Sequence, residues 1–386
     1  MVPTLSTELD RRAAHEAPAR PRARVGPHRA RGRPTASVVI GTALWLTLLG
    51  SPLARGVAGR LGLGEPPGRV VARRGASRAG RVVLGAVWTF VGCHFSARDS
   101  LARWGPVGSS TVAALVLVLA LAGAASLYCW VASVVSGDTS WVDRLWSILP
   151  VIYTWVFVWA DHGRDARLDV LAVLVTLWGA RLTFNFARKG GYRGVEDYRW
   201  AVLRARMTRG QFQLFNLGFI VLVQNGLLVL ITMPDWRAFQ HRRGAHYGLA
   251  DAFVALLFLA GLALETVADE QQWRFQEGKR LAREAGRTPG ADFLTTGLFA
   301  YSRHPNYFFE LAQWWLVYAL GALALGHVLD WTILGPAALT GLFVGSTRFT
   351  EEISSAKYPG YRDYQARVSA IVPWPSRTSR VAATPE

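Results

Sequence analysis

Four polar side chains that could bind a charged ligand gather in YSRHPNYFFE, residues 301–310: Arg303, His304, Asn306 and Glu310. Arginine and histidine can hold an anion, while amide and carboxylate oxygens accept hydrogen bonds from hydroxyl groups. Pro305 favours a helix start, and the first free N–H groups of a helix also attract an anion. An apolar run follows at once. Polar groups placed where a helix enters a bilayer therefore indicate a ligand site beside the membrane.

Two other segments carry polar residues at helical spacing. Arg181 and Asn185 lie four residues apart, on one helical face. They could equally be an arginine that reaches the membrane interface and an amide that bonds a neighbouring helix. A polar stripe suited to ribose hydroxyls or to an amide-bearing ring recurs at Glu265, Asp269, Gln272 and Gln276. A solvated helix face would explain this stripe as well.

The segment 347–374 combines charges with regularly spaced tyrosines. Arg348 and Glu352 are four residues apart, and tyrosines recur every third residue at Tyr358, Tyr361 and Tyr364. Taken alone, the segment predicts an amphipathic helix at the membrane interface. Together with the other groups it predicts the cover of a pocket that faces the cytosol.

Two residues could donate a proton or hold a substrate oxygen. Tyr307 adds a phenol to the first cluster, and Asp143 lies in the tryptophan-rich segment SWVDRLW. An ion pair between Asp143 and Arg144 at a helix end is the alternative. Gln224 and Asn225 lie in the middle of an apolar run, where they are expected to form hydrogen bonds between helices.

Long apolar runs must position these residues. Of the 386 residues, 51% are hydrophobic and 18% are charged, and the charges cluster between the runs. This pattern predicts an all-α polytopic membrane protein in contact with lipid. About seven transmembrane helices are expected, near 111–135, 141–160, 168–187, 212–233, 249–267, 307–326 and 331–347.

The arginines and lysines set the expected orientation. They concentrate in 188–211, in 268–306 and after 348, three regions that fall on one side of the predicted spans. The positive-inside rule makes that side, and the C-terminus, cytoplasmic. The same rule explains the net charge of +17 without a nucleic-acid partner. Cys93 and Cys129 are the two cysteines and no HExxH pattern occurs, so no metal site is expected.

The chain divides into four predicted regions. Residues 1–36 read as a disordered basic tail, and 37–106 as an extension in which 37–53 lies at the interface and 82–97 crosses the membrane. Residues 107–374 form the membrane domain, and 375–386 form a disordered tail. The sequence predicts no oligomeric state.

Five motifs together resemble the steroid 5-alpha-reductase family, and more closely its bacterial branch. They are WVDRLWSILP, RLTFNFARKGGY, ADEQQWRFQ, GLFAYSRHPNYFFE and the closing EE…KYPGYRDYQARV…PW, within residues 111–374. The resemblance implies a seven-helix membrane fold that holds NADPH in a cytosol-facing cavity and admits a hydrophobic small-molecule substrate from the lipid. The implied reaction reduces a carbon–carbon double bond conjugated to a ketone.

The resemblance also implies roles for individual residues. Asn306 and Glu310 match cofactor contacts, and Asp269 matches an acidic position on the preceding helix. Asp143 and Tyr307 are the implied catalytic groups, which would hydrogen-bond the ketone oxygen. The remaining implied cofactor contacts are Arg181, Asn185, Arg303, His304, Arg348, Glu352 and Tyr361.

Two departures from the family bear on the substrate. Phe309 stands where the branch usually has glycine, which predicts a reshaped pocket. Trp178 falls near the position of the tyrosine that holds the steroid ketone in the animal enzymes, so a steroid substrate is not supported. The alternative family is that of the isoprenylcysteine carboxyl methyltransferases, which share an RHPxY motif. In that case S-adenosylmethionine would be held by His304, Tyr307 and Glu352.

Overall fold

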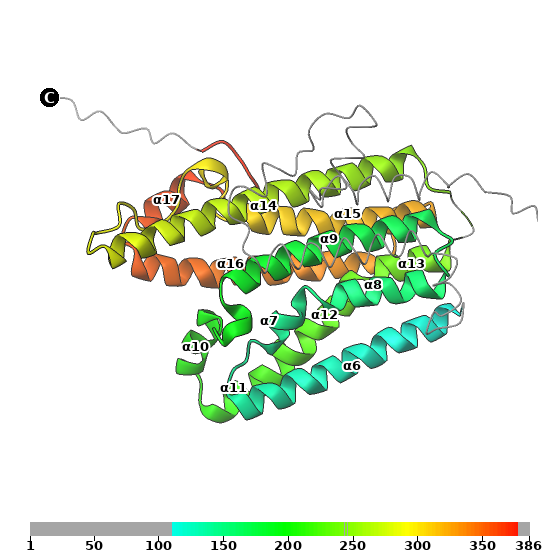
Figure 1. Ribbon diagram of the computed structural model, residues 1–386, viewed down its shortest axis with the longest axis horizontal. Coiled ribbons are helices and arrows are strands. Elements are labelled where there is room, and N and C mark those ends of the chain that lie inside the picture. Colours follow the sequence, from blue (N-terminus) through cyan, green and yellow to red (C-terminus); the bar gives the residue numbers. More distant parts are fainter. Residues whose placement is uncertain (1–109, 243, 245, 377–386) are drawn as a thin grey trace, which may run out of the picture.

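The computed structural model describes residues 110–376 except 243 and 245, and this part of the chain is a bundle of helices (Figure 1). The described residues hold no strand, and Ser302 and Ser369 form an isolated β-bridge. Three predictions fall outside the described residues: the tail 1–36, the extension 37–106 with its apolar stretches 37–53 and 82–97, and all but the first two residues of the C-terminal tail 375–386.

Within the described part of the chain, five helical segments are long and apolar enough to cross a membrane: Thr111–Ser136 (α6), Ala166–Arg188 (α9), Arg209–Gln240, Leu249–Glu284 (α14) and Pro305–Leu325 (α15). The predicted all-α polytopic architecture is thereby confirmed. The other two predicted spans differ in form. Residues 141–160 divide into Trp141–Trp146 (α7) and Leu149–Ala160 (α8), where Pro150 lacks the N–H that would continue the helix.

The last predicted span, 331–347, is part of a longer and more polar element. A 3-10 turn, Trp331–Ile333 (η4), leads into Leu334–Lys357 (α16). The final turns of α16 carry charged residues, and the short helix Tyr361–Arg367 (α17) follows.

The segment Arg209–Gln240 is irregular along its length. It begins as Arg209–Phe215 (α11), becomes π-helical over Asn216–Val223 (η2), and returns to α geometry in Gln224–Ile231 (α12). Pro234 then starts Met233–Gln240 (α13). A π-helical turn holds an extra residue and often marks a functional site.

Glycine allows close helix crossings, which matter in a membrane because packing rather than the hydrophobic effect joins the helices. A Cβ atom on Gly179 of α9 would lie 2.5 Å from the Ser147 carbonyl oxygen. One on Gly335 of α16 would lie 2.5 Å from the Leu230 carbonyl oxygen. These crossings fix α9 against the α7–α8 region, and α16 against α12.

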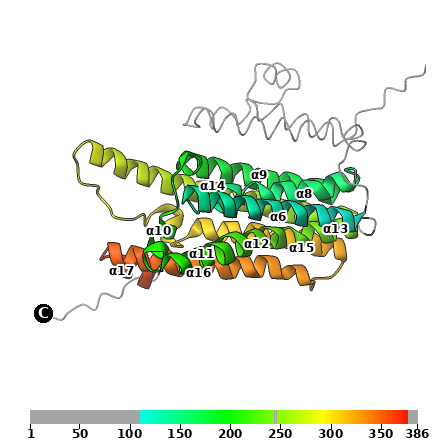
Figure 2. The same ribbon diagram turned by 90° about the horizontal axis from the view of Figure 1, so that it is seen from below.

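The three basic segments meet at one end of the bundle, called here the basic end. The C-terminal ends of α9, α14 and α16 lie there, together with Tyr198–Ala205 (α10) and α17 (Figures 1 and 2). This arrangement agrees with the shared side predicted for 188–211, 268–306 and the segment after 348. At the opposite end, ion pairs connect helix ends and the loops beside them: Arg167–Asp251 at 2.5 Å, Arg242–Asp161 at 2.9 Å and Arg237–Asp330 at 3.0 Å.

Candidate functional site

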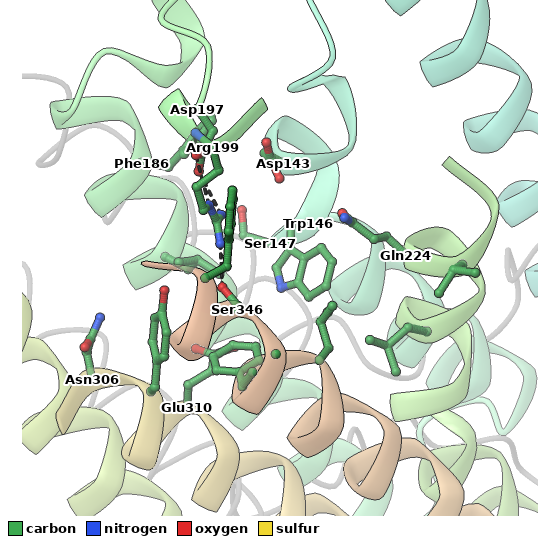
Figure 3. A pocket seen from close by; sticks show the side chains of 18 of the residues that line it. Asp143, Trp146, Ser147, Phe186, Asp197, Arg199, Gln224, Asn306, Glu310 and Ser346 are labelled. Carbon is green, nitrogen blue, oxygen red and sulfur yellow. Dashed lines mark hydrogen bonds and ion pairs between the residues drawn. The ribbon is translucent and has the colours of Figure 1, made fainter. Parts of the chain in front are cut away.

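A cavity of about 1020 Å³ extends from the basic end into the bundle, between α7, α9, α10, α12, α14, α15 and α16 (Figure 3). One wall is polar and is formed by α9, α14 and α15. The opposite wall is largely apolar and is formed by η2, α12 and α16. The cavity could therefore hold a polar molecule and a hydrophobic one side by side.

Arg181 lies at the centre of the polar wall. Its guanidinium is 2.7 Å from a Glu265 oxygen, 2.5 Å from an Asp269 oxygen and 3.2 Å from a Glu310 oxygen. All four side chains are less than 10% exposed. Since three carboxylates surround one cation, this wall has more hydrogen-bond acceptors than donors. Buried charged groups need partners. This wall favours a ligand that donates hydrogen bonds, such as a hydroxyl group or a carboxamide.

Local helix geometry explains this convergence. Glu265 and Asp269 are one turn apart on α14, and Glu310 lies near the start of α15. Trp178, one turn before Arg181 on α9, donates from its indole nitrogen to Glu310 at 3.0 Å. This indole bond fixes the Glu310 carboxylate against the polar wall.

Two further cations line the cavity. Lys189, just past the end of α9, has an exposed side chain and makes no hydrogen bond or ion pair among the described residues. Arg199 of α10 donates to Asp197 at 2.8 Å and to Ser346 at 2.6 Å (Figure 3). Lys189 is thus available to an anionic ligand.

The structure brings seven of the predicted site residues to this cavity: Asp143, Arg181, Asn185, Asp269, Asn306, Tyr307 and Glu310. Trp200 of α10 donates to Asp143 at 3.1 Å. The Tyr307 ring stacks on the His304 ring, with 5.2 Å between centroids, and Tyr307 lines the cavity. Both implied catalytic groups therefore border the same space.

Arg303 and His304 do not line the cavity. Arg303 forms a two-point ion pair with Glu351 of α16, at 2.6 and 2.9 Å, and His304 contacts the same carboxylate at 3.1 Å. Arg303 also donates to the Gln365 carbonyl oxygen at 2.9 Å. These bonds attach the loop before α15 to the C-terminal segment, so the two side chains are already engaged by protein groups.

Glu351 holds this contact, called here the C-terminal clamp, which comprises Glu351, Arg303, His304 and Gln365. Burial alone would raise the pKa of Glu351, but hydrogen bonds from His304, Arg303 and Gln365 lower it to about 2. The carboxylate is therefore ionised at neutral pH. Backbone bonds from Arg303 to Ser369 at 2.8 Å extend the contact.

The other three predicted residues also lie away from the cavity lining. Arg348 and Glu352 are exposed, and Glu352 pairs with Arg206 at 3.0 Å. Tyr361 is buried against Phe293, with 5.1 Å between ring centroids, and burial raises its pKa to about 12. Arg348 and Glu352 are on the surface because the side of α16 that turns inward carries Glu351 instead, and Tyr361 of α17 occupies a packing position.

Several cavity residues were not singled out from the sequence as site residues. Glu265 could have been chosen, because it lies one turn before Asp269 on the same stripe. Lys189 and Arg199 lie in the basic segment 188–211, where the sequence does not distinguish them from the neighbouring arginines. Phe309, expected to reshape the pocket, is not among the lining residues.

Comparison with known proteins places the chain among relatives without an assigned activity. A family model described as "Protein of unknown function (DUF1295)" matches residues 129–368. An uncharacterised protein of Schizosaccharomyces pombe is 40% identical over 258 residues, which cover 63% of this chain and 75% of the relative. No solved structure matches.

Proposed function

We propose that this chain, which belongs to the DUF1295 family, is a membrane-embedded reductase that uses NADPH. Its substrate would be a hydrophobic molecule with a carbon–carbon double bond conjugated to a ketone. The observation that carries the proposal is the single cavity in which a polar wall centred on Arg181 faces an apolar wall of η2, α12 and α16. The resemblance to the steroid 5-alpha-reductases, carried by the RHPNY segment and its partners, points the same way.

The donors and acceptors of the polar wall suit a nicotinamide dinucleotide. Glu310 and Asp269 offer acceptors to a carboxamide and to ribose hydroxyls, and Asn306 offers both a donor and an acceptor. Lys189 offers a cation to a phosphate, and the Nε atom of Arg181 has no hydrogen-bond partner among the described side chains. When bound, NADPH would supply the hydride.

Protein groups on the other side of the cavity would handle the substrate. Tyr307 and Asp143 both line the cavity, where the Tyr307 hydroxyl, or Asp143 as the protonated acid, could donate a hydrogen bond to a ketone oxygen. A donor placed there stabilises the negative charge that develops on the oxygen during reduction. The apolar wall excludes water from the reacting carbons.

The proposal also includes an orientation. The basic end carries the arginine-rich segments, and by the positive-inside rule it would lie in the cytoplasm with the C-terminus. The polar wall would then open toward the compartment that holds soluble NADPH.

Thermal unfolding of the detergent-purified protein with added NADPH, NADH or S-adenosylmethionine tests the cofactor. A ligand at 100 times its Kd stabilises the folded state by about 2.7 kcal/mol. We expect NADPH to raise the Tm, and Glu310→Gln and Lys189→Met to reduce this response. Arg274→Met, on the exposed part of α14, is the matched control and should respond like the wild type. A protein that ignores NADPH contradicts the proposal.

The methyltransferase alternative receives less support from the geometry. Two of the residues that would hold S-adenosylmethionine have different partners: His304 contacts the Glu351 carboxylate, and Glu352 forms an ion pair with Arg206. A rise in Tm with S-adenosylmethionine alone would nevertheless replace the reductase proposal with methyl transfer.

A further inference from the structure

Gln224, in the middle of a membrane-spanning segment, borders the cavity. It is the first residue of α12, directly after the π-helical η2. Its side chain lines the cavity on the side where α12 packs against α7, and Figure 3 draws it on the α12 side, beyond Trp146. Gln224 is 4% exposed, so the cavity is the space that its amide can reach.

The amide of Gln224 has no partner among residues 110–376, the part of the chain that the structure describes. No hydrogen bond joins its side chain to another described residue, contrary to the expected bond between helices. Two buried amides nearby use their NH2 groups: Asn216 donates to Ser133 at 2.9 Å, and Asn225 donates to the Val221 carbonyl oxygen at 2.9 Å, although the Oδ1 atoms of both have no partner among the described residues. Burying an amide without a partner is costly. A polar group in this position inside a membrane therefore indicates a ligand.

The surfaces next to Gln224 are apolar or small. The residues that line the same cavity from its own segment are Phe219, Leu222, Val223, Leu227 and Leu230, and α16 contributes Gly341 and Leu342 to the lining. A ligand that contacts both Gln224 and these surfaces must be mostly hydrocarbon and carry a hydrogen-bonding oxygen. Asp143, on α7, borders the same cavity, so more than one polar group can surround that oxygen.

We propose that Gln224 determines substrate specificity by donating a hydrogen bond from its amide to the carbonyl oxygen of a lipid-like ketone. The inference rests on the proposed function in one respect, namely that the apolar side of this cavity holds the substrate. It adds a residue that selects ketones over hydrocarbons of the same shape. A site built to bond an oxygen discriminates strongly against an analogue that lacks it, because the amide is then left unpaired.

The test uses matched pairs of ligands and quenching of tryptophan fluorescence, since Trp146 and Trp200 line the cavity. The pairs are cholestenone with cholestene, and heptadecanone with heptadecane. We expect the wild-type protein to bind at least one ketone roughly 10- to 100-fold more tightly than its hydrocarbon. Gln224→Met keeps the length of the side chain and should reduce that preference to about twofold or less. Gln213→Met, at an exposed position of α11, should leave it unchanged.

A second measurement needs no ligand. Because its amide has no partner, Gln224→Met should leave the Tm of the apo protein unchanged or higher. A clearly lower Tm would mean that Gln224 supports the fold, and would overturn the inference. A wild-type protein that prefers neither ketone, or a variant that keeps the wild-type preference, would overturn it as well.

The NADPH response separates this inference from the proposed function. If NADPH fails to raise the Tm while ketone preference still depends on Gln224, the reductase proposal fails and the specificity assignment stands. If NADPH binds and Gln224→Met retains full ketone preference, the reductase proposal stands and the specificity assignment fails.

Discussion

Replacement of Glu351 by glutamine tests the C-terminal clamp most directly. The change keeps the size of the side chain but removes its charge, and the Glu351 carboxylate receives two bonds from Arg303 and one each from His304 and Gln365. The Arg303 and Glu351 side chains are each 9% exposed. In Glu351→Gln the Arg303 guanidinium therefore stays buried without an opposite charge.

The expected cost follows from that burial. Removing one partner of a buried ion pair costs about 3–5 kcal/mol. Each 1.4 kcal/mol corresponds to about a tenfold change in an equilibrium constant, so the C-terminal segment should open at least roughly 100 times more often. Cleavage by trypsin at Arg362 and Arg367, which are exposed on α17, should accelerate by the same factor when opening is fast.

A neighbouring residue provides the control. Glu352→Gln removes a surface pair with Arg206 in which both side chains are more than 50% exposed. Such a pair contributes about 0–1 kcal/mol, so its cleavage rate should stay close to that of the wild type. Equal trypsin rates for Glu351→Gln and Glu352→Gln would refute the assignment of the clamp to Glu351.

Acid should weaken the clamp in a defined range. The pKa of Glu351 is lowered from 4.5 to about 2, so its stabilising contribution is complete above pH 4.5 and is lost as the pH falls toward 2. Cleavage by pepsin, which works in acid, should show the protection of the wild type fading across this range. Glu351→Gln should lack that pH dependence.

Three further predictions concern the bundle and the cavity. Arg181→Met leaves Glu265, Asp269 and Glu310 without their cation and should lower the stability by about 3–5 kcal/mol, against about 0.5 kcal/mol for the surface variant Arg274→Met, both measured by chemical unfolding. Gly179→Ala should lose about 1–3 kcal/mol because its Cβ would meet the Ser147 carbonyl oxygen at 2.5 Å, whereas Gly123→Ala, with no atom within 4 Å, should be neutral or stabilising in the same assay. Phe309→Ala should leave the response of the Tm to NADPH unchanged, because Phe309 does not line the cavity; a reduced response would contradict this placement.

Hydropathy predicted most of the spans but not their full lengths. The predicted helix 111–135 is Thr111–Ser136, and 168–187 is Ala166–Arg188. The predicted helix 249–267 instead continues to Glu284. Beyond the apolar part, ion pairs within the helix, such as Arg274 with Glu270 at 2.7 Å, support it in water. Such pairs are visible in the sequence, but a hydropathy pattern ends before them.

The site was predictable where residues share a helix face, and less so where helices face one another. Spacing joined Arg181 to Asn185, and Glu265 to Asp269, but it could not show that Arg181 binds both acids. On α16 the four-residue spacing of Arg348 and Glu352 pointed to a helix face that is exposed in the structure. Buried residues recur there at a different phase, at Gly335, Leu339, Thr347 and Glu351, and that row would have identified Glu351.

The π-helical stretch can lose a residue without disturbing its neighbours, whereas α12, which follows it, cannot. An insertion of one residue is absorbed locally in a π turn, so deleting one residue from 216–223 can return the stretch to α geometry with both flanks still aligned. A deletion within α12 has no such slack and would rotate all that follows by about 100°. Relatives that differ in length should therefore gain or lose a residue before position 224 rather than after it.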